Sequence, residues 1–282
     1  MYRIPVDLGG SCPNRDGKGK GGCAFCPENG GRAVQLGDVA SPAEQVAHAI
    51  RFSRERYGTG LLQLYVQAYT ATYTSVRNLR MQIEPLLDAH PFYSVSLGTR
   101  PDCLPPATLD LFRKWNSSHE VWIELGVQTT LDATLERIDR RHGWERSREA
   151  ILRLHDAGLH VCAHLMFGLP GECADDMFES LERVVALPVD ALKFHNLHIL
   201  SDAPLGAEWR RRPFPVLSES AWMELVMQLL RRTPAHLPVF RVFTDSPAAT
   251  RLAPKAEFRK GEFLQGVAFR MRERGWRQGD RT

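Results

Sequence analysis

The chain has 282 residues, of which 43% are hydrophobic and 24% are charged, with a modest net charge of +3. These values are typical of a globular protein with one large domain or two small ones. No run of 18 or more apolar residues occurs and Met1–Val6 carries no apolar signal core, which predicts a cytoplasmic protein with no membrane partner. Cytoplasmic thiols are usually reduced, so the six cysteines are not expected to form disulfides.

Short β-branched or aromatic runs alternate with helical patterns along the chain. The expected strands lie at 3–8, 61–66, 93–97, 121–126, 160–167 and 191–199. The expected helices lie at 41–57, 75–89, 107–115, 146–157, 174–186 and 219–231. This alternation is typical of βαβ units and a parallel sheet, and it fits either an open doubly wound sheet or a partial barrel.

Polar and glycine-rich segments follow most of the expected strands. They lie at 67–70, 98–102, 124–128, 168–172 and 195–198. In both kinds of parallel sheet, ligands bind at the carboxyl ends of the strands. We therefore expect the active-site residues to lie together at the carboxyl ends of the strands, in a single opening of the sheet, its mouth.

Cys12, Cys23 and Cys26 lie in a glycine-rich loop after the first strand, with the spacing C-x10-C-x2-C. A structural zinc site normally takes four protein ligands, often as two close pairs, whereas three thiolates on a [4Fe–4S] cluster leave one iron open. Zinc bound with a further cysteine or histidine remains an alternative, as does a chance grouping of buried thiols. The other three cysteines are expected to be packing residues.

This loop, with the aromatic Phe25 just before its last cysteine, resembles the radical S-adenosylmethionine (SAM) superfamily. More narrowly, the chain is similar to the YhcC/YtqA-type proteins, relatives of the catalytic subunit of the elongator complex. The matching segments lie at 10–17, 67–70, 98–103, 122–129, 161–165, 168–172, 193–200, 252–254 and 274–279. One departure is Arg140-Arg141-His142, where the family usually has Arg-Gly-His.

The resemblance implies an α/β fold, a partial (β/α)6 radical SAM barrel over residues 1–232, with a basic C-terminal extension over 233–282 packed on it. It also implies a [4Fe–4S] cluster on Cys12, Cys23 and Cys26 whose open iron binds SAM. One-electron transfer, from a reduced flavodoxin or ferredoxin, would then cleave SAM to a 5′-deoxyadenosyl radical.

The resemblance assigns cofactor contacts to residues near the strand ends. The expected cofactor-binding residues are Phe25, Gln67, Tyr69, Arg100, Glu124, Gln128, His164 and Gly168. Arg100 suits the SAM carboxylate because a guanidinium pairs bidentately with it, although an ion pair with Asp102 is an equal alternative. Glu124 suits ribose hydroxyls because a carboxylate in an apolar strand is costly to bury alone. For Phe25 and His164 the alternative is an ordinary core position.

Lys193 and His195 are the expected catalytic residues. They alternate on a strand, so their side chains share one face. Together with His198 they could contact SAM or position the substrate. A purely structural role is the alternative.

The substrate suggested by the elongator relatives is C5 of the wobble uridine in tRNA. A plausible step converts a carboxymethylaminomethyl side chain to aminomethyl, and acetyl transfer is not expected. From Arg251 onward the chain has nine Lys and Arg and four Asp and Glu, an excess of five positive charges that suits a phosphate-rich partner. Trp276 lies among these residues and could stack on a base. The alternatives are a radical SAM enzyme for a small metabolite or protein side chain, and a non-catalytic zinc-binding protein that contacts nucleic acid.

Overall fold

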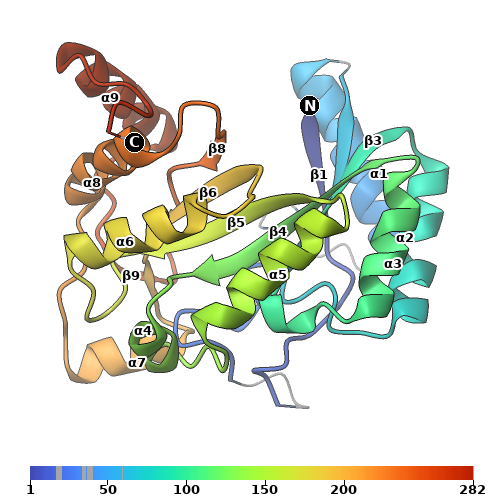
Figure 1. Ribbon diagram of the computed structural model, residues 1–282, viewed down its shortest axis with the longest axis horizontal. Coiled ribbons are helices and arrows are strands. Elements are labelled where there is room, and N and C mark those ends of the chain that lie inside the picture. The colour runs from blue at the N-terminus through green and yellow to red at the C-terminus, as the bar shows by residue number, and fades with distance from the viewer. Residues whose placement is uncertain (17–20, 34–35, 37–40, 59, 282) are drawn as a thin grey trace.

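A curled sheet of seven parallel strands forms the centre of the molecule (Figure 1). The computed structural model describes residues 1–16, 21–33, 36, 41–58 and 60–281. In their order across the sheet, the strands are β1 (Tyr2–Val6), β2 (Leu62–Val66), β3 (Phe92–Thr99), β4 (Glu120–Gln128), β5 (His160–Phe167), β6 (Ala191–Asn196) and β8 (Val239–Arg241). The predicted α/β fold with a parallel, barrel-like sheet is confirmed.

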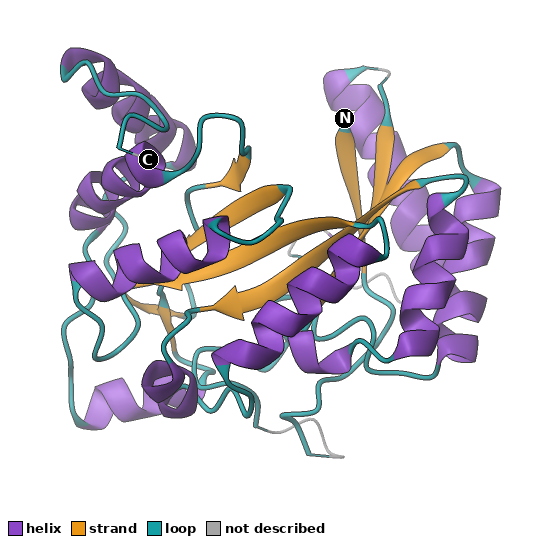
Figure 2. Ribbon diagram, viewed as in Figure 1, coloured by secondary structure: helices purple, strands orange, loops and turns teal. Residues whose placement is uncertain are grey.

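Helices connect the strands and cover the outer side of the sheet (Figure 2). They are α1 (Pro42–Tyr57), α2 (Val76–Ala89), α3 (Pro106–Asn116), α5 (Trp144–Asp156), α6 (Ala174–Val185) and α8 (Glu219–Arg232). Helix α2 begins where Ser75 accepts a hydrogen bond from the backbone N–H of Asn78 at 3.1 Å, and Ser218 caps α8 in the same way. No helix in the described part of the chain is long and apolar enough to cross a membrane.

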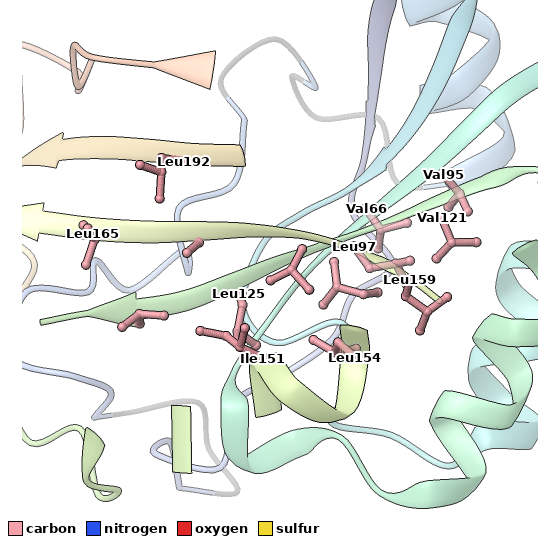
Figure 3. Packing of buried hydrophobic residues seen from close by; sticks show 14 of the residues in the cluster. Val66, Val95, Leu97, Val121, Leu125, Ile151, Leu154, Leu159, Leu165 and Leu192 are labelled. Carbon is pink, nitrogen blue, oxygen red and sulfur yellow. The ribbon is translucent and has the colours of Figure 1, made fainter. Parts of the chain in front are cut away.

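The two faces of the sheet differ in chemistry, because side chains alternate along each strand. The outward-facing side chains are apolar and pack against the helices, as Leu125 of β4 does near Ile151 and Leu154 of α5 (Figure 3). Each such side chain contributes roughly 1.5–3 kcal/mol on burial. The inner face instead carries the polar and aromatic residues described below.

Six of the seven strands were predicted from the sequence, and β8 was not. Strand β8 is only three residues long, and it pairs with β6 through Leu192–Val239 and Lys193–Arg241. It lies beyond residue 232, so the C-terminal segment contributes to the sheet as well as packing on it. The last expected strand, 191–199, is interrupted after Asn196; the short β7 (Ile199–Leu200) pairs with β9 (Arg251–Ala253) instead.

Four further elements were also not predicted, three of them short and one a helix of 14 residues. They are α4 (Asp132–Arg137), α7 (Pro204–Arg211), α9 (Lys260–Glu273) and the 3-10 turn η2 (Pro101–Cys103). Helix α9 packs on α8 through ion pairs from Arg270 and Arg274 to Glu224, at 2.7 and 2.6 Å. Trp276 lies against the guanidinium groups of Arg231 and Arg274, at 4.2 and 4.8 Å. Trp276 is thus already stacked within the protein.

Candidate active site

The three cysteines of the motif lie in one loop at the carboxyl end of β1. The loop turns at Cys23, whose carbonyl accepts a hydrogen bond from the N–H of Cys26 at 2.8 Å. Between them, Ala24 is tied by backbone hydrogen bonds to Ile138 after α4 and to Leu205 of α7, both at 2.8 Å. Elements distant in the sequence therefore hold the loop in place.

Two glycines allow the loop its tight course. Gly21 and Gly22 have φ angles of +93° and +111°, which L side chains rarely adopt. A Cβ atom at Gly21 would lie 3.0 Å from the carbonyl oxygen of Asn14, and one at Gly22 would lie 3.2 Å from the guanidinium of Arg15. The glycines therefore allow the backbone at 21–22 to approach Asn14 and Arg15 closely.

Hydrogen-bond donors surround two of the sulfur atoms. Cys23 Sγ lies 3.3 Å from Asn14 Nδ2, 3.5 Å from Arg100 Nη1 and 3.4 Å from Arg140 Nη1. Cys26 Sγ lies 3.5 Å from Arg15 Nη2. Burial raises the pKa of Cys26 above its usual value, and the nearby Arg15 guanidinium offsets this rise only in part. Asn14, Arg15 and Arg140 were not among the residues predicted for the active site.

Arg140 reaches the loop past a glycine in β4. Its guanidinium donates to the carbonyl oxygen of Gly126, and a Cβ atom there would lie 2.9 Å from Arg140 Nη2. The next residue, Arg141, has a φ of +61°. Glycine adopts this left-handed conformation without steric cost, which explains the glycine usual in the family at this position.

The donor set fits a [4Fe–4S] cluster. Among the described residues, no three His, Cys, Asp or Glu side chains converge closely enough to hold a single metal ion. A four-iron cluster attaches each thiolate to a different iron, so its cysteines need not meet at one point. Burial raises the pKa of Cys103 to about 12 and that of Cys162 further, so both favour the thiol form.

Several expected cofactor-binding residues lie around the cysteine loop. Phe25 packs in a small apolar cluster with residues of α4 and α7. Tyr69 donates a hydrogen bond to the carbonyl of Glu28 at 2.8 Å and packs under the guanidinium of Arg15. Gln67 directly follows the last residue of β2. Their contacts with SAM stay predictions.

Other residues expected at the mouth lie at the ends of β3, β4 and β5. Arg100 donates two hydrogen bonds to the Asp102 carboxylate, at 2.8 and 2.9 Å, and a third to Cys23 Sγ. The pair with Asp102 is the role that was the alternative to a contact with the SAM carboxylate. Gln128 ends β4 with a φ of +75°, and Gly168 follows β5 with a φ of +81°. With its donors engaged in this way, Arg100 is better placed to support the cysteine loop than to bind a free carboxylate.

A second group of polar residues lies deeper, on the inner face of the sheet. Glu124 is fully buried and forms an ion pair with the equally buried Lys193. The same carboxylate oxygen accepts a hydrogen bond from Tyr65 at 2.8 Å and lies 3.1 Å from His164 Nε2. The other oxygen lies 3.1 Å from Arg3 Nη1. One oxygen of Glu124 is therefore shared by three protein groups, whereas the other is buried near Arg3 without a hydrogen-bond partner among the described residues.

Burial and these contacts determine the protonation states in the deep group. Burial would raise the pKa of Glu124, but the His164 contact and the charges of Lys193 and Arg3 bring it well below its usual value. Burial lowers the pKa of Lys193 to about 8, although the charge of Glu124 acts to raise it. Burial also lowers the pKa of His164 to about 4. Near neutral pH the group thus holds a carboxylate and an ammonium beside neutral imidazoles.

The expected site residues form two layers, which lie at different depths along the strands of the same sheet. The cysteine loop, Arg100 and Gln128 lie at the strand ends, whereas Glu124, His164, Lys193 and His195 lie on the inner face. The reason is that β4 continues to Gln128, two residues beyond the expected end, so Glu124 lies in mid-strand. Arg3 and Tyr65 complete the deep layer, and their alternation on the expected strands could have indicated them.

The comparisons with known proteins agree with this architecture. Residues 9–184 match the model of the Radical SAM superfamily, and residues 189–273 match that of the Radical_SAM C-terminal domain. The chain belongs to the radical SAM superfamily. Its cofactors are accordingly a [4Fe–4S] cluster and SAM, and it is an enzyme.

Relatives of this radical SAM chain include YhcC of Escherichia coli, 35% identical over 90% of this chain and 82% of YhcC. YtqA of Bacillus subtilis is 31% identical over 99% of this chain and 87% of YtqA. A tRNA uridine(34) acetyltransferase of Methanocaldococcus jannaschii is 27% identical over 56% of this chain and 29% of its own length.

The solved structure of an archaeal Elp3 from Methanocaldococcus infernus, with an N-terminal deletion, superposes with a TM-score of 0.77. It is 19% identical and covers 98% of this chain, which in turn spans 63% of the Elp3 chain. At that identity the likeness concerns the fold.

Proposed function

We propose that this radical SAM enzyme modifies the C5 side chain of the wobble uridine in tRNA, and that Cys12, Cys23 and Cys26 hold its cluster. The observation that carries the proposal is the cysteine loop, in which Asn14 and three guanidinium groups lie within 3.5 Å of the motif sulfurs. Hydrogen bonds to sulfur tune the potential of an iron–sulfur cluster, and positive groups beside the sulfurs would offset the charge of iron-bound thiolates.

The choice of tRNA follows the relative that acts on uridine 34, whose similarity covers 56% of this chain. Its acetyltransferase activity is not carried over, because this chain matches only 29% of it. We infer remodelling of an existing side chain, such as carboxymethylaminomethyl to aminomethyl. Loss of a hydrogen atom to the radical, of one electron to the oxidised cluster and of a proton, followed by addition of water, would break the C–N bond of the carboxymethyl group and release it as glyoxylate. When bound, the reduced cluster and SAM supply a radical able to remove a hydrogen atom from carbon; a flavodoxin or ferredoxin would provide the electron.

The two layers of residues would then have different roles, one in binding SAM and the other in binding the substrate. The mouth residues Gln67, Tyr69 and Gln128, with the backbone at Gly168, would position SAM beside the loop. Lys193 and His195 would face the substrate from the inner face, since both lie on β6 and point the same way. Glu124 and His164 would keep Lys193 charged and oriented, because the three groups are in contact.

Anaerobically reconstituted protein should cleave SAM to 5′-deoxyadenosine when a reductant is added, slowly without substrate. The physical reason is that three cysteines leave one iron free for SAM. Chromatographic quantification of 5′-deoxyadenosine measures this reaction. The enzyme assignment to this loop fails if protein with a full cluster binds SAM but releases none, even with bulk tRNA present.

The modified nucleosides of bulk tRNA distinguish the tRNA substrate from a small metabolite. Digested tRNA from wild-type and deletion strains should differ in a C5-substituted uridine. Identical nucleoside profiles, together with normal SAM cleavage in vitro, would leave the radical chemistry intact and contradict the tRNA proposal.

We expect tRNA to contact the exposed cations of the C-terminal segment. Lys260, Arg272 and Arg277 are exposed and form no ion pair with a described residue, whereas Arg270 and Arg274 are occupied by Glu224. Reversing those three charges to Glu should weaken tRNA binding and flatten the plot of log affinity against log salt. Each phosphate that the variant no longer neutralises should reduce the slope by roughly 0.7–0.9.

Filter binding at several salt concentrations measures this slope. The matched control reverses three exposed arginines of α1 and α2, Arg51, Arg54 and Arg77, on the opposite side of the molecule (Figure 1). Equal slopes for the two triple variants would show that the C-terminal segment is not the tRNA contact.

A further inference from the structure

The curl of the sheet brings its two edge strands together across the inner face. Phe240 of β8 has its ring 5.3 Å from the guanidinium of Arg3 on β1 and 5.3 Å from the ring of Trp122 on β4. Strands β1 and β8 are the outermost strands of the sheet. Side chains from both edges therefore enclose the deep layer around Glu124.

This enclosed face carries more positive than negative charge. Arg3, Lys193 and Arg241 contribute three positive charges, and Arg241 is the partner of Lys193 in the strand register. In the described part of the chain, Glu124 is the one carboxylate that forms an ion pair with any of them. Three positive charges against one negative charge leave an excess of two.

The nearby acidic residues do not offset this excess. Glu120 and Asp190 lie at the amino-terminal ends of β4 and β6, where both approach His160 at 3.5 and 3.4 Å. Arg241 is exposed and forms no ion pair with a described residue. Its charge is therefore available to a ligand.

A neutral imidazole lies beside the cations. The ring of His195 lies 5.3 Å from that of His164, and its Nε2 atom is buried without a hydrogen-bond partner among the described residues. Burial, with the charges of neighbours that include Arg241 and Lys193, lowers the pKa of His195 well below its usual value. An unpartnered ring nitrogen on the same face as the Arg241 guanidinium, which forms no ion pair with a described residue, is a suitable environment for an anion.

We propose that the inner face of the barrel binds an anionic group of the substrate, a carboxylate or a phosphate, between Arg241, Lys193 and His195. Arg241 supplies the charge that no protein carboxylate in the described chain neutralises, and His195 supplies a neutral hydrogen-bonding atom. This assignment rests on the proposed function, because it concerns the substrate of the same site. It narrows that substrate to one whose carboxylate or phosphate can reach the inner face of the barrel.

The test compares three ligands by calorimetric titration of cluster-loaded protein with SAM, without oxygen and at low salt. Uridine is the neutral reference, 5-carboxymethyluridine carries a carboxylate, and uridine 5′-monophosphate carries a phosphate. At least one anion should bind about tenfold more tightly than uridine, as expected for one charge-assisted contact. The anion that is preferred identifies the source of the negative group.

Variants of Arg241 connect that preference to the site. Arg241→Gln should remove most of it, and Arg241→Lys should retain most because the charge remains. Arg77→Gln, an exposed arginine of α2 with no ion pair to a described residue, is the matched control and should change nothing.

The inference is overturned if the three ligands bind equally or not at all, or if Arg241→Gln leaves the preference intact. SAM cleavage by the same wild-type preparation reports on the proposed function independently. Cleavage without anion preference would contradict this inference alone, whereas absence of cleavage would contradict the function.

Discussion

Replacing Cys23 with alanine should abolish binding of the iron–sulfur cluster, and the same result is expected for Cys12→Ala and Cys26→Ala. Three thiolates are the minimum that holds the cluster while one iron stays open, so loss of one leaves it with two protein ligands. Cys23 is also the sulfur with the most donors around it, namely Asn14, Arg100 and Arg140. Iron and sulfide content after anaerobic reconstitution, with the broad visible absorbance of the cluster, measures the loss.

The matched control is Cys162→Ala. Cys162 is fully buried in β5, on the inner face and away from the cysteine loop. Its removal should leave iron content unchanged. A Cys23→Ala protein with full iron content, or a Cys162→Ala protein without iron, would show that the motif does not hold the cluster.

Glu124→Ala should lower the free energy of unfolding by about 3–5 kcal/mol, the usual cost of removing one partner from a buried ion pair. Lys193, 0% exposed, would lose its carboxylate, and Tyr65 would lose the acceptor of its hydroxyl. Urea unfolding at constant cluster content measures the change. The control Glu149→Ala removes an exposed partner of Arg146 and should cost less than about 1 kcal/mol.

The pH dependence of the same variant separates lost charge pairing from lost packing. Without Glu124, the pKa of Lys193 falls below its present value of about 8, so the folded protein releases a proton that the unfolded chain retains up to about pH 10. The stability of the variant should therefore rise with pH, by up to about 1.4 kcal/mol per pH unit, and this rise should begin at a lower pH than in the wild type. The double variant Glu124→Gln, Lys193→Met should recover much of the loss. A pH-independent deficit that the double variant does not repair would mean that the ion pair is not its cause.

The order of strands and helices was predictable from the chain because the signals are local. Alternation of apolar runs with helical periods located six strands and six helices within a few residues of their observed ends. Strand β8 was not predicted because its three residues, Val239–Arg241, are too few to show an alternating pattern. They form a strand because they pair with β6.

The sequence by itself also indicated the loop that is proposed to hold the cluster. Cys12, Cys23 and Cys26 are close in the chain, and Gly21 and Gly22 between them indicate the tight loop. Their partners were not predictable in the same way. Arg100 and Arg140 come from separate connections, 77 and 117 residues from Cys23, and only the curl of the sheet brings both guanidinium groups to one sulfur.

The tertiary structure alone decided which polar residues act together. Glu124 and Gln128 lie four residues apart in one strand, yet the first pairs with Lys193 on the inner face and the second ends the strand at the mouth. Depth along a strand depends on where pairing with the neighbours stops, which is a property of the sheet. Likewise, Arg3 and Phe240 from the two ends of the chain meet because the sheet curls until its edge strands face each other.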